Sequence, residues 1–329
     1  MKPAVLVCRA VFPAIIDRLR EHFEVETNEA DVVWTQPELI AHLQGKAGVF
    51  VTGTQPIDTA LLEACPELRA VCSMAVGYNN IDVPACTARG VLVSNAPDVL
   101  TETTADFGFA LMMAAARRIT ESEHFLRSGA WTKWSVDAFA GVDVHGATLG
   151  VLGMGRIGQA IARRGALGFG MKVLYHNRSK LDAATEAALG ARWVDKETLL
   201  RGSDHLVIVV PYSAASHHLV GAAELALMKP SATLTNIARG GIVDDAALAR
   251  ALREHRIAAA GLDVFEGEPA VHPELLTLPN VVLTPHIASA SLPTRRAMAN
   301  LAVDNLLAAL GVGPLRGKPP TPLNPSVLA

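Results

Sequence analysis

Short apolar runs alternate with helical patterns along the first hundred residues of this 329-residue chain. Each run is brief and contains β-branched residues, as in AVLVC at residues 4–8. Such alternation predicts a parallel sheet that helices cover on both faces, because parallel strands need crossover connections. The expected strands are residues 4–8, 23–26, 48–51, 70–74 and 91–94, and the expected helices are 13–20, 37–43, 57–64 and 83–89.

The alternation restarts after a long helical segment at residues 101–128, so the chain contains a second α/β unit. A last helical pattern, residues 292–310, follows that unit. We therefore expect a domain of residues 101–287 that is inserted into a domain formed by residues 1–100 and 288–329. The second unit is expected to contain strands 148–152, 172–175, 206–210, 232–236, 258–265 and 280–284 and helices 157–167, 221–228 and 244–255.

The composition excludes several kinds of partner. Half of the residues are hydrophobic, and 29 basic residues nearly balance 32 acidic residues without forming the basic stripe that binds nucleic acid. No apolar run reaches the roughly 18 residues that a membrane span requires, and the N-terminus does not resemble a signal peptide. The four cysteines lack the spacing of a metal site or a disulfide framework. We expect a soluble, cytoplasmic protein without nucleic-acid or membrane partners.

A glycine-rich segment, GMGRIG at residues 153–158, lies between a predicted strand and the helix that follows it. Gly153 permits a tight turn, Gly155 lets a pyrophosphate approach the backbone, and Gly158 lets the helix lie close to the strand. The helix N-terminus then offers N–H groups to the phosphates. This context predicts a dinucleotide site that is formed by Gly153, Met154, Gly155, Arg156, Ile157 and Gly158.

The next strand ends in a turn that indicates which dinucleotide is bound. NAD sites usually place a carboxylate about twenty residues after the last glycine, where it binds the ribose hydroxyl. Here Arg178 occupies that position, Asn177 and Ser179 flank it, and no carboxylate follows before Asp182. Arginine and serine can hold a 2′-phosphate, so the turn favours NADPH, with NADH as the second choice. The alternative is that Arg178 and Lys180 only form a solvated turn.

Three polar residues of the second unit, Arg239, Glu268 and His286, come after predicted strands, at the edge where open parallel sheets bind ligands. Reduction of a 2-keto acid needs a cation for the carboxylate, an acid for the carbonyl oxygen and a carboxylate that orients that acid. Arg239, His286 and Glu268 can supply these functions in that order. Each residue alone has another explanation, as a surface ion-pair partner, a turn residue or a cap, so the prediction depends on their occurring together.

The chain resembles the D-isomer-specific 2-hydroxyacid dehydrogenases in four segments, GMGRIG, NIARGGIVDDAAL, AAAGLDVFEGEP and VVLTPHIASAS. Within that family it resembles the glyoxylate/hydroxypyruvate reductases, including those that also reduce 2-ketogluconate, in the segment NAPDVLTETTADFGFALMMAAARR. The resemblance implies two flavodoxin-like or Rossmann domains, the active site in the cleft between them, and a homodimer formed through the nucleotide domains. It also implies NADPH-preferring reduction of glyoxylate, hydroxypyruvate or 2-ketogluconate to D-2-hydroxy acids.

The resemblance also implies roles for individual residues. Arg239 is expected to anchor the substrate carboxylate, His286 to act as the acid/base, and Glu268 to be its partner. The backbone amides near Val76 and Gly77 are expected to bind the same carboxylate. The implied cofactor contacts beyond the glycine loop are Thr104, Asn177, Arg178, Ser179, Pro211, Ile237, Ala238, Arg239, Asp263 and His286.

Two alternative functions are left open by these residues. A related NAD-dependent enzyme such as 3-phosphoglycerate dehydrogenase is disfavoured by the turn at Arg178 and by the short tail after the last helix. A dinucleotide-sensing protein, like the corepressors that share this fold, can retain the same three polar residues. Only the expected lack of extra terminal segments argues against that second alternative.

Two further pairs of residues attract attention without supporting a role. His217 and His218 look like a metal pair, but the sequence offers no third ligand at a useful spacing, so no metal is expected. Trp131 and Trp134 are expected either at the mouth of an active site or in surface packing.

Overall fold

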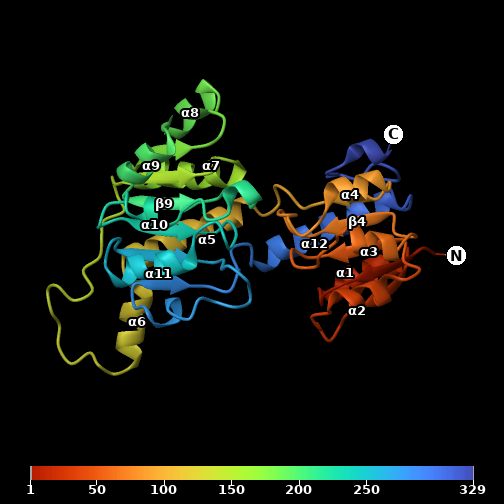
Figure 1. Ribbon diagram of the computed structural model, residues 1–329, viewed down its shortest axis with the longest axis horizontal. Helices are drawn as coiled ribbons and strands as arrows, with labels where there is room; N and C mark the ends of the chain where they lie inside the picture. Colours follow the sequence, from red (N-terminus) through yellow and green to blue (C-terminus); the bar gives the residue numbers. More distant parts are fainter. Residues whose placement is uncertain (1, 329) are drawn as a thin grey trace. The chain divides into compact units, whose positions relative to one another are not determined.

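The computed structural model describes residues 2–328, so Met1 and Ala329, which the expected domain ranges include, lie outside the described residues. The chain divides into two compact units: unit 1 is residues 1–100 with 291–329, and unit 2 is residues 101–290. The second junction lies at Ser291 rather than at residue 288. Each unit contains a parallel sheet with helices around it, which confirms the predicted fold class (Figure 1).

Unit 1 contains the sheet that the first hundred residues predict. Its strands are β1 (Ala4–Val7), β2 (Glu24–Thr27), β3 (Gly48–Val51), β4 (Ala70–Ser73) and β5 (Leu92–Ser94). They pair in the order β2-β1-β3-β4-β5, and every pairing is parallel. Its helices are α1 (Pro13–Arg20), α2 (Gln36–Leu43), α3 (Thr59–Ala64), α4 (Val83–Ala88) and α12 (Leu292–Ala309), and a short 3-10 turn follows at Pro325–Leu328.

Helix α12 completes unit 1 although it comes from the other end of the chain. It packs against β3, β4 and β5, and its side chains Met298, Val303 and Leu306 are buried. Gly48 permits this close approach, because a Cβ atom there would lie 2.7 Å from Leu306 Cδ1. The packing explains why the last helical segment belongs to unit 1.

Unit 2 contains the second parallel sheet. Its strands are β6 (Thr148–Leu152), β7 (Lys172–His176), β8 (Ala191–Trp193), β9 (His205–Ile208), β10 (Thr233–Asn236), β11 (Ala259–Leu262) and β12 (Val281–Leu283). They pair in the order β12-β11-β10-β9-β6-β7-β8. Its helices are α5 (Thr101–Ala116), α6 (Ile119–Arg127), α7 (Arg156–Arg163), α8 (Ala183–Leu189), α9 (Lys196–Gly202), α10 (Ala222–Leu225) and α11 (Asp245–Arg253), with shorter turns at Arg164–Gly168, Ala214–Ser216 and Leu275–Thr277. Within residues 2–328, no helix combines the length and the apolar character needed to cross a membrane.

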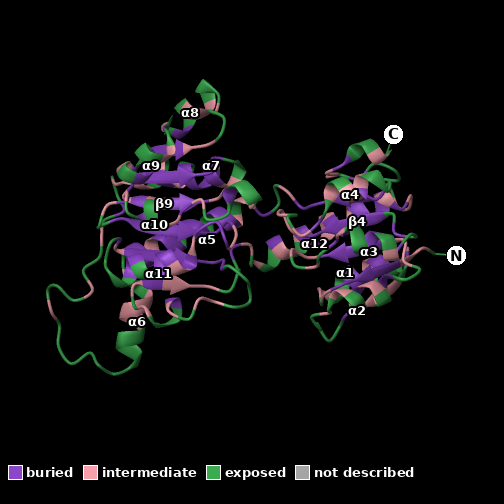
Figure 2. Ribbon diagram, in the orientation of Figure 1, coloured by how far each residue is buried: buried purple, intermediate pink, exposed green. Residues whose placement is uncertain are grey.

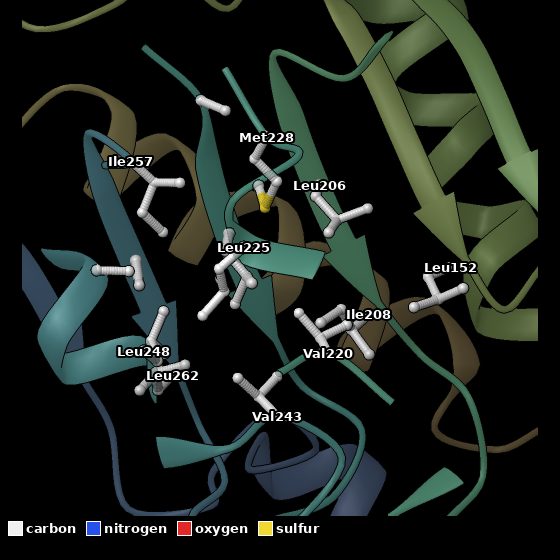
Figure 3. Close-up of a cluster of buried hydrophobic side chains, with 14 of the residues drawn as sticks. Leu152, Leu206, Ile208, Val220, Leu225, Met228, Val243, Leu248, Ile257 and Leu262 are labelled. Carbon is white, nitrogen blue, oxygen red and sulfur yellow. The ribbon is translucent and has the colours of Figure 1, made fainter. Parts of the chain in front are cut away.

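Apolar side chains pack on both faces of this second sheet. Along β9, Leu206 belongs to a cluster with α10 and α11, whereas the next residue, Val207, belongs to a cluster with α5 and α7. Figure 3 shows the first cluster, in which Leu225 of α10 and Leu248 of α11 lie over the strands. Neighbouring residues of a strand point to opposite faces, so helices on both sides hold the strands. The carboxyl ends of the strands are therefore fixed positions for the turns that follow them.

The predicted helix at residues 101–128 is wrong in one respect, because this segment forms two helices. Helix α5 ends at Ala116, and Arg118 adopts a left-handed backbone with a φ of 53° before α6 begins. Val142 N donates a hydrogen bond to Ala116 O at 3.0 Å, and a Cβ atom on Gly141 would lie 2.3 Å from that oxygen. The returning chain thus packs across the end of α5, where a continuous helix would need the space.

Three further elements of unit 2, α8, β8 and α9, were not predicted from the sequence. Strand β8 is a three-residue edge strand, which is too short to give a recognisable alternation. Both helices begin at an aspartate whose Oδ1 caps the backbone: Asp182 accepts a hydrogen bond from Thr185 N, and Asp195 accepts one from Thr198 N. The repeated pattern of aspartate followed three residues later by threonine is the signal that predicts both helices.

Candidate active site

The glycine-rich segment forms the turn between β6 and α7. Gly153 has a φ of 103°, and a Cβ atom there would lie 2.7 Å from Val210 N, so only glycine fits. A Cβ atom on Gly158 would lie 2.2 Å from Gly153 O, so the first turn of α7 packs directly against the loop. Gly155 is the N-cap residue of α7, and because it is glycine it has no side chain that could cap the helix. The space around its Cβ position is open. A helix N-terminus of this kind binds phosphate through its first N–H groups.

The turn after β7 lies beside this loop. Asn177 Oδ1 accepts a hydrogen bond from Met154 N at 2.6 Å, so the turn and the glycine loop hold each other in place. Arg178 follows and is exposed, and no carboxylate within residues 2–328 forms an ion pair with it. Lys180 instead pairs with Glu186 at 3.2 Å. The turn therefore presents a guanidinium without a competing carboxylate, which suits a phosphate better than a ribose hydroxyl.

The remaining residues that were predicted to contact the cofactor lie at several places in unit 2. Thr104 lies on α5, and its buried hydroxyl has no hydrogen-bond partner among the described residues, which suits contact with a ligand. Together with the N-terminus of α7, this hydroxyl fits a dinucleotide cofactor. The other predicted contacts are exposed at Pro211 and Ser179 and buried at Ile237 and Ala238.

Arg239 lies in a tightly packed turn after β10. Asn236, the last residue of that strand, shapes the turn: its Oδ1 accepts a hydrogen bond from Ala238 N at 3.1 Å, and its Nδ2 donates one to Arg239 O at 3.2 Å. A Cβ atom on Gly240 would lie 1.7 Å from Phe265 O, so a side chain cannot fit there. The turn of Arg239 therefore rests directly on the turn that leads to Glu268. Sequence reasoning did not assign Asn236 or Gly240 this role.

The Glu268 carboxylate and the His286 imidazole are in direct contact. Glu268 Oε2 lies 2.8 Å from His286 Nδ1, and Glu268 Oε1 accepts a hydrogen bond from Phe265 N at 2.9 Å. Burial raises the pKa of Glu268, but the hydrogen bonds from His286 and Phe265 outweigh burial and hold that pKa below its ordinary value. The carboxylate is therefore ionised at neutral pH and keeps a proton on Nδ1, which leaves Nε2 of the partly exposed ring for a ligand.

Arg239 belongs to the same electrostatic group. Burial lowers the pKa of Arg239, and the negative charge of Glu268 opposes that effect. The charge of Arg239 in turn helps to lower the pKa of Glu268. A cation that has lost part of its hydration gains from an anionic ligand, and a guanidinium matches a carboxylate in shape. The fold thus brings Arg239, Glu268 and His286 together within unit 2.

Asp263 accepts hydrogen bonds from the segment that contains His286. It follows β11, which ends at Leu262 rather than at residue 265 as predicted. Asp263 Oδ1 accepts hydrogen bonds from Thr284 Oγ1 at 2.7 Å and from Ile287 N at 2.8 Å, and Oδ2 accepts one from Ala288 N at 2.8 Å. These bonds hold His286 in a left-handed backbone conformation, with a φ of 54°. Sequence reasoning named Asp263 only as a cofactor contact and missed this positioning role.

Val76 and Gly77 lie in unit 1, in the turn after β4. Asn95 Nδ2 donates a hydrogen bond to Val76 O at 2.7 Å and so helps to fix the turn. Neither the Val76 amide nor the Gly77 amide donates a hydrogen bond to a described residue. Both amides are therefore available to a ligand, as the sequence prediction requires.

One expectation about metal ligands needs correction. The sequence offers no third ligand near His217 and His218, yet the fold places Glu266 beside them. Glu266 is remote from the two histidines in the sequence and reaches them because the segments after β9 and β11 meet. Spacing along the chain therefore gave an incomplete view of this cluster.

The chain is similar to known proteins over nearly its whole length. The sequence profile of the family described as D-isomer specific 2-hydroxyacid dehydrogenase, NAD binding domain, matches residues 109–288. The chain is 46% identical to a glyoxylate reductase of Thermococcus onnurineus, over 94% of this chain and 93% of that protein. It is also 46% identical to glyoxylate/hydroxypyruvate reductase B of Yersinia enterocolitica, over 94% of this chain and 95% of that protein. Among solved structures, an NADPH-dependent glyoxylate/hydroxypyruvate reductase of Sinorhizobium meliloti, in complex with NADP and malonate, has a TM-score of 0.85 at 37% identity and covers 99% of this chain and 98% of its own.

Proposed function

Because the chain belongs to the D-isomer-specific 2-hydroxyacid dehydrogenases, we propose that it reduces small 2-keto acids to D-2-hydroxy acids and prefers NADPH. Glyoxylate and hydroxypyruvate are the first candidate substrates, and 2-ketogluconate is the third. The observation that carries this proposal is the 2.8 Å contact between Glu268 and His286, in the same unit as the glycine loop and Arg239.

The proposed reaction transfers one hydride and one proton to the carbonyl group. NADPH, when bound, supplies the hydride to the carbonyl carbon. His286 donates the proton from Nε2 to the carbonyl oxygen, and the ionised Glu268 stabilises the charged imidazole before that transfer. Arg239 binds the substrate carboxylate through its planar fork. The amides of Val76 and Gly77 are proposed as further hydrogen-bond donors to this carboxylate.

Initial rates of NADPH and NADH oxidation test this function directly. Each cofactor is supplied with glyoxylate, hydroxypyruvate or 2-ketogluconate, and the loss of nicotinamide absorbance is followed. Fast NADPH-dependent turnover of one of these acids supports the proposal, and the ranking of kcat/KM identifies the preferred substrate. Tight NADPH binding without turnover of any 2-keto acid would instead favour the dinucleotide-sensing alternative, and a clear preference for NADH would favour a related NAD-dependent enzyme.

Arg178 is proposed to set the cofactor preference. Replacing it with alanine removes the guanidinium from the turn beside the glycine loop, so the 2′-phosphate of NADPH loses a charge-assisted hydrogen bond. Such bonds contribute about 1.5–3 kcal/mol, so kcat/KM with NADPH is expected to fall about 10- to 100-fold while the value with NADH changes little. The measurement is the ratio of the two kcat/KM values.

Lys180→Ala is the matched control for Arg178→Ala. Lys180 is a nearby cation of the same turn, but it already pairs with Glu186. Its removal is expected to leave the cofactor ratio nearly unchanged. Equal ratios in the wild type and the Arg178→Ala variant would mean that Arg178 only forms part of a solvated turn.

We further propose that the protein is a homodimer and that α6 with the segment after it forms the interface. None of the described residues of α6 is buried within the chain, and Figure 2 shows this helix and the segment after it as mainly exposed. Large apolar side chains are exposed there, including Leu126, Trp131, Trp134 and Val136. The exposed fraction of Trp134 is 75%. An apolar surface of this kind on a single chain usually marks a protein interface.

The double variant Leu126→Glu and Trp134→Ser is therefore expected to convert the dimer into a monomer. Sedimentation or light scattering measures this as a change from twice the 34.7 kDa chain mass to that mass itself. Val33→Glu is the control, because Val33 is an equally exposed apolar residue of unit 1. A wild-type protein that is monomeric at all concentrations would contradict the proposal.

A further inference from the structure

A cluster of metal-ligating side chains lies in unit 2, separate from the Glu268–His286 contact. His217 and His218 follow the short turn Ala214–Ser216, and Glu266 lies in the turn after β11. His218 Nε2 is 2.8 Å from Glu266 Oε2, and His217 Nε2 is 3.8 Å from Glu266 Oε1. One ligand atom from each residue lies within 4.8 Å of the other two. Among the described residues, this is the one group of three such side chains.

Backbone contacts hold both segments of the cluster in place. His218 has a left-handed backbone, with a φ of 49°, and its N–H donates a hydrogen bond to Gly241 O at 2.7 Å. Gly241 leaves room for the cluster, because a Cβ atom there would lie 3.3 Å from His217 Nδ1. On the other side, Glu266 N donates a hydrogen bond to the buried Asp245 at 3.1 Å. The three side chains are therefore presented by fixed backbone rather than by a loose loop.

A hydrogen bond between His217 and Tyr212 orients the imidazole as a ligand. Tyr212 Oη lies 3.2 Å from His217 Nδ1, so the hydroxyl can accept the proton of that nitrogen. The Nε2 lone pair then faces Glu266, and a polar partner on the other ring nitrogen is the usual arrangement for a metal-bound histidine. The 3.8 Å between His217 Nε2 and Glu266 Oε1 is too long for a hydrogen bond. It is close to the separation of about 3.4 Å between nitrogen and oxygen ligands of one tetrahedral Zn²⁺ ion.

Binding an ion would require only a local rearrangement. The two imidazoles now stack with their centroids 3.9 Å apart and their planes 21° apart, so they must tilt for both lone pairs to meet at one point. The exposed fractions of the His217, His218 and Glu266 side chains are 42%, 39% and 43%, which leaves them free to turn and leaves a fourth position open to water. The hydrogen bond between His218 and Glu266 would be replaced by two bonds to the ion.

We propose that His217, His218 and Glu266 form a binding site for a divalent transition-metal ion of borderline softness, such as Zn²⁺. Two imidazoles and a carboxylate with one open position are a donor set that Zn²⁺ accepts. His218 is hydrogen-bonded to Gly241, which lies in the turn after Arg239, and Glu266 lies in the turn that precedes Glu268. An ion bound by His218 and Glu266 would therefore link these two turns. The proposal goes beyond the proposed reductase function and does not depend on it.

Calorimetric titration of the purified, tag-free protein with zinc chloride tests this site without any substrate. We expect one Zn²⁺ to bind per chain. His217→Ala, His218→Ala and Glu266→Gln are each expected to weaken binding at least about tenfold, because even partners of metal ligands contribute 10- to 100-fold to affinity. Tyr212→Phe keeps the ring but removes the hydroxyl, so it is expected to weaken binding by a smaller factor. Thermal unfolding without metal checks that each variant is folded.

Two controls separate this site from other histidines. His42 is about as exposed as His218 and contacts Glu26 at 2.5 Å, but it belongs to no group of three ligands among the described residues. His42→Ala is therefore expected to leave Zn²⁺ affinity unchanged. His286→Ala is also expected to keep full affinity. Loss of binding in His286→Ala with retention in the three cluster variants would overturn the proposal, since the ion would then occupy the Glu268–His286 pair. A wild-type protein that binds no Zn²⁺ would overturn it as well.

Discussion

Replacing His286 with alanine is expected to lower kcat for 2-keto acid reduction by about 10²- to 10⁴-fold, the usual contribution of a general acid. The reason is the geometry of the pair: the ionised Glu268 lies 2.8 Å from Nδ1 and stabilises the charged imidazole, whose Nε2 proton then passes to the carbonyl oxygen. This proton matters only as charge develops on that oxygen, so the loss should fall on kcat. The dissociation constant of NADPH, measured by fluorescence titration, is expected to change far less.

A matched control for this variant is His255→Ala. His255 is exposed, lies in unit 2 and has a left-handed backbone with a φ of 52°, very close to the 54° of His286. Its replacement removes a histidine from the same kind of backbone but is expected to leave kcat unchanged. Glu268→Gln should lower kcat less than His286→Ala, because the acid remains while its stabilising charge is lost. Equal losses of kcat and NADPH affinity in His286→Ala would contradict the assignment of His286 as the acid.

Much of the candidate site was predictable because its polar residues follow the ends of parallel strands. Parallel strands in one sheet end at one edge, so polar residues directly after several strands must lie near one another. That reasoning placed Arg239, Glu268 and His286 in one group, and the structure places Glu268 and His286 in contact. The predicted family and the fold class are confirmed. The NADPH preference, the homodimer, the cytoplasmic location and the residue roles stay predictions.

The contacts that fix this group were not predictable from local patterns. The Gly240 backbone approaches Phe265, and the Asp263 carboxylate accepts three hydrogen bonds from the segment around His286. Each contact joins residues that are about twenty or more positions apart, and its partner depends on how the turns meet after the sheet has formed. The same limit explains Glu266, whose approach to His218 no spacing rule reveals. The break between α5 and α6 is a further case, because Gly141 returns to pack on Ala116.

Arg239→Ala is expected to raise KM for the 2-keto acid on the order of 100-fold, because a bidentate pair loses two charge-assisted hydrogen bonds of about 1.5 kcal/mol each. Burial makes an anionic partner valuable to this guanidinium, and its turn is held by Asn236 and by the Gly240 contact, so the fork is fixed before substrate binds. Arg239→Lys keeps the charge without the fork and should recover only part of the loss.

The sequence allows two roles for Arg239, as a substrate anchor or as a cofactor contact. Two measurements on the same variants separate these roles: the steady-state KM for the keto acid and the dissociation constant of NADPH. Substrate anchoring predicts a large change in KM and a small change in NADPH affinity, whereas a cofactor contact predicts the reverse. Arg253→Ala is the control, because Arg253 is an exposed arginine of α11 that pairs with Glu274. Since Arg239 also helps to keep Glu268 ionised, its removal should lower kcat as well, but by less than His286→Ala does. A kcat loss as large as that of His286→Ala, with KM unchanged, would mean that Arg239 acts on the acid/base pair rather than on the substrate.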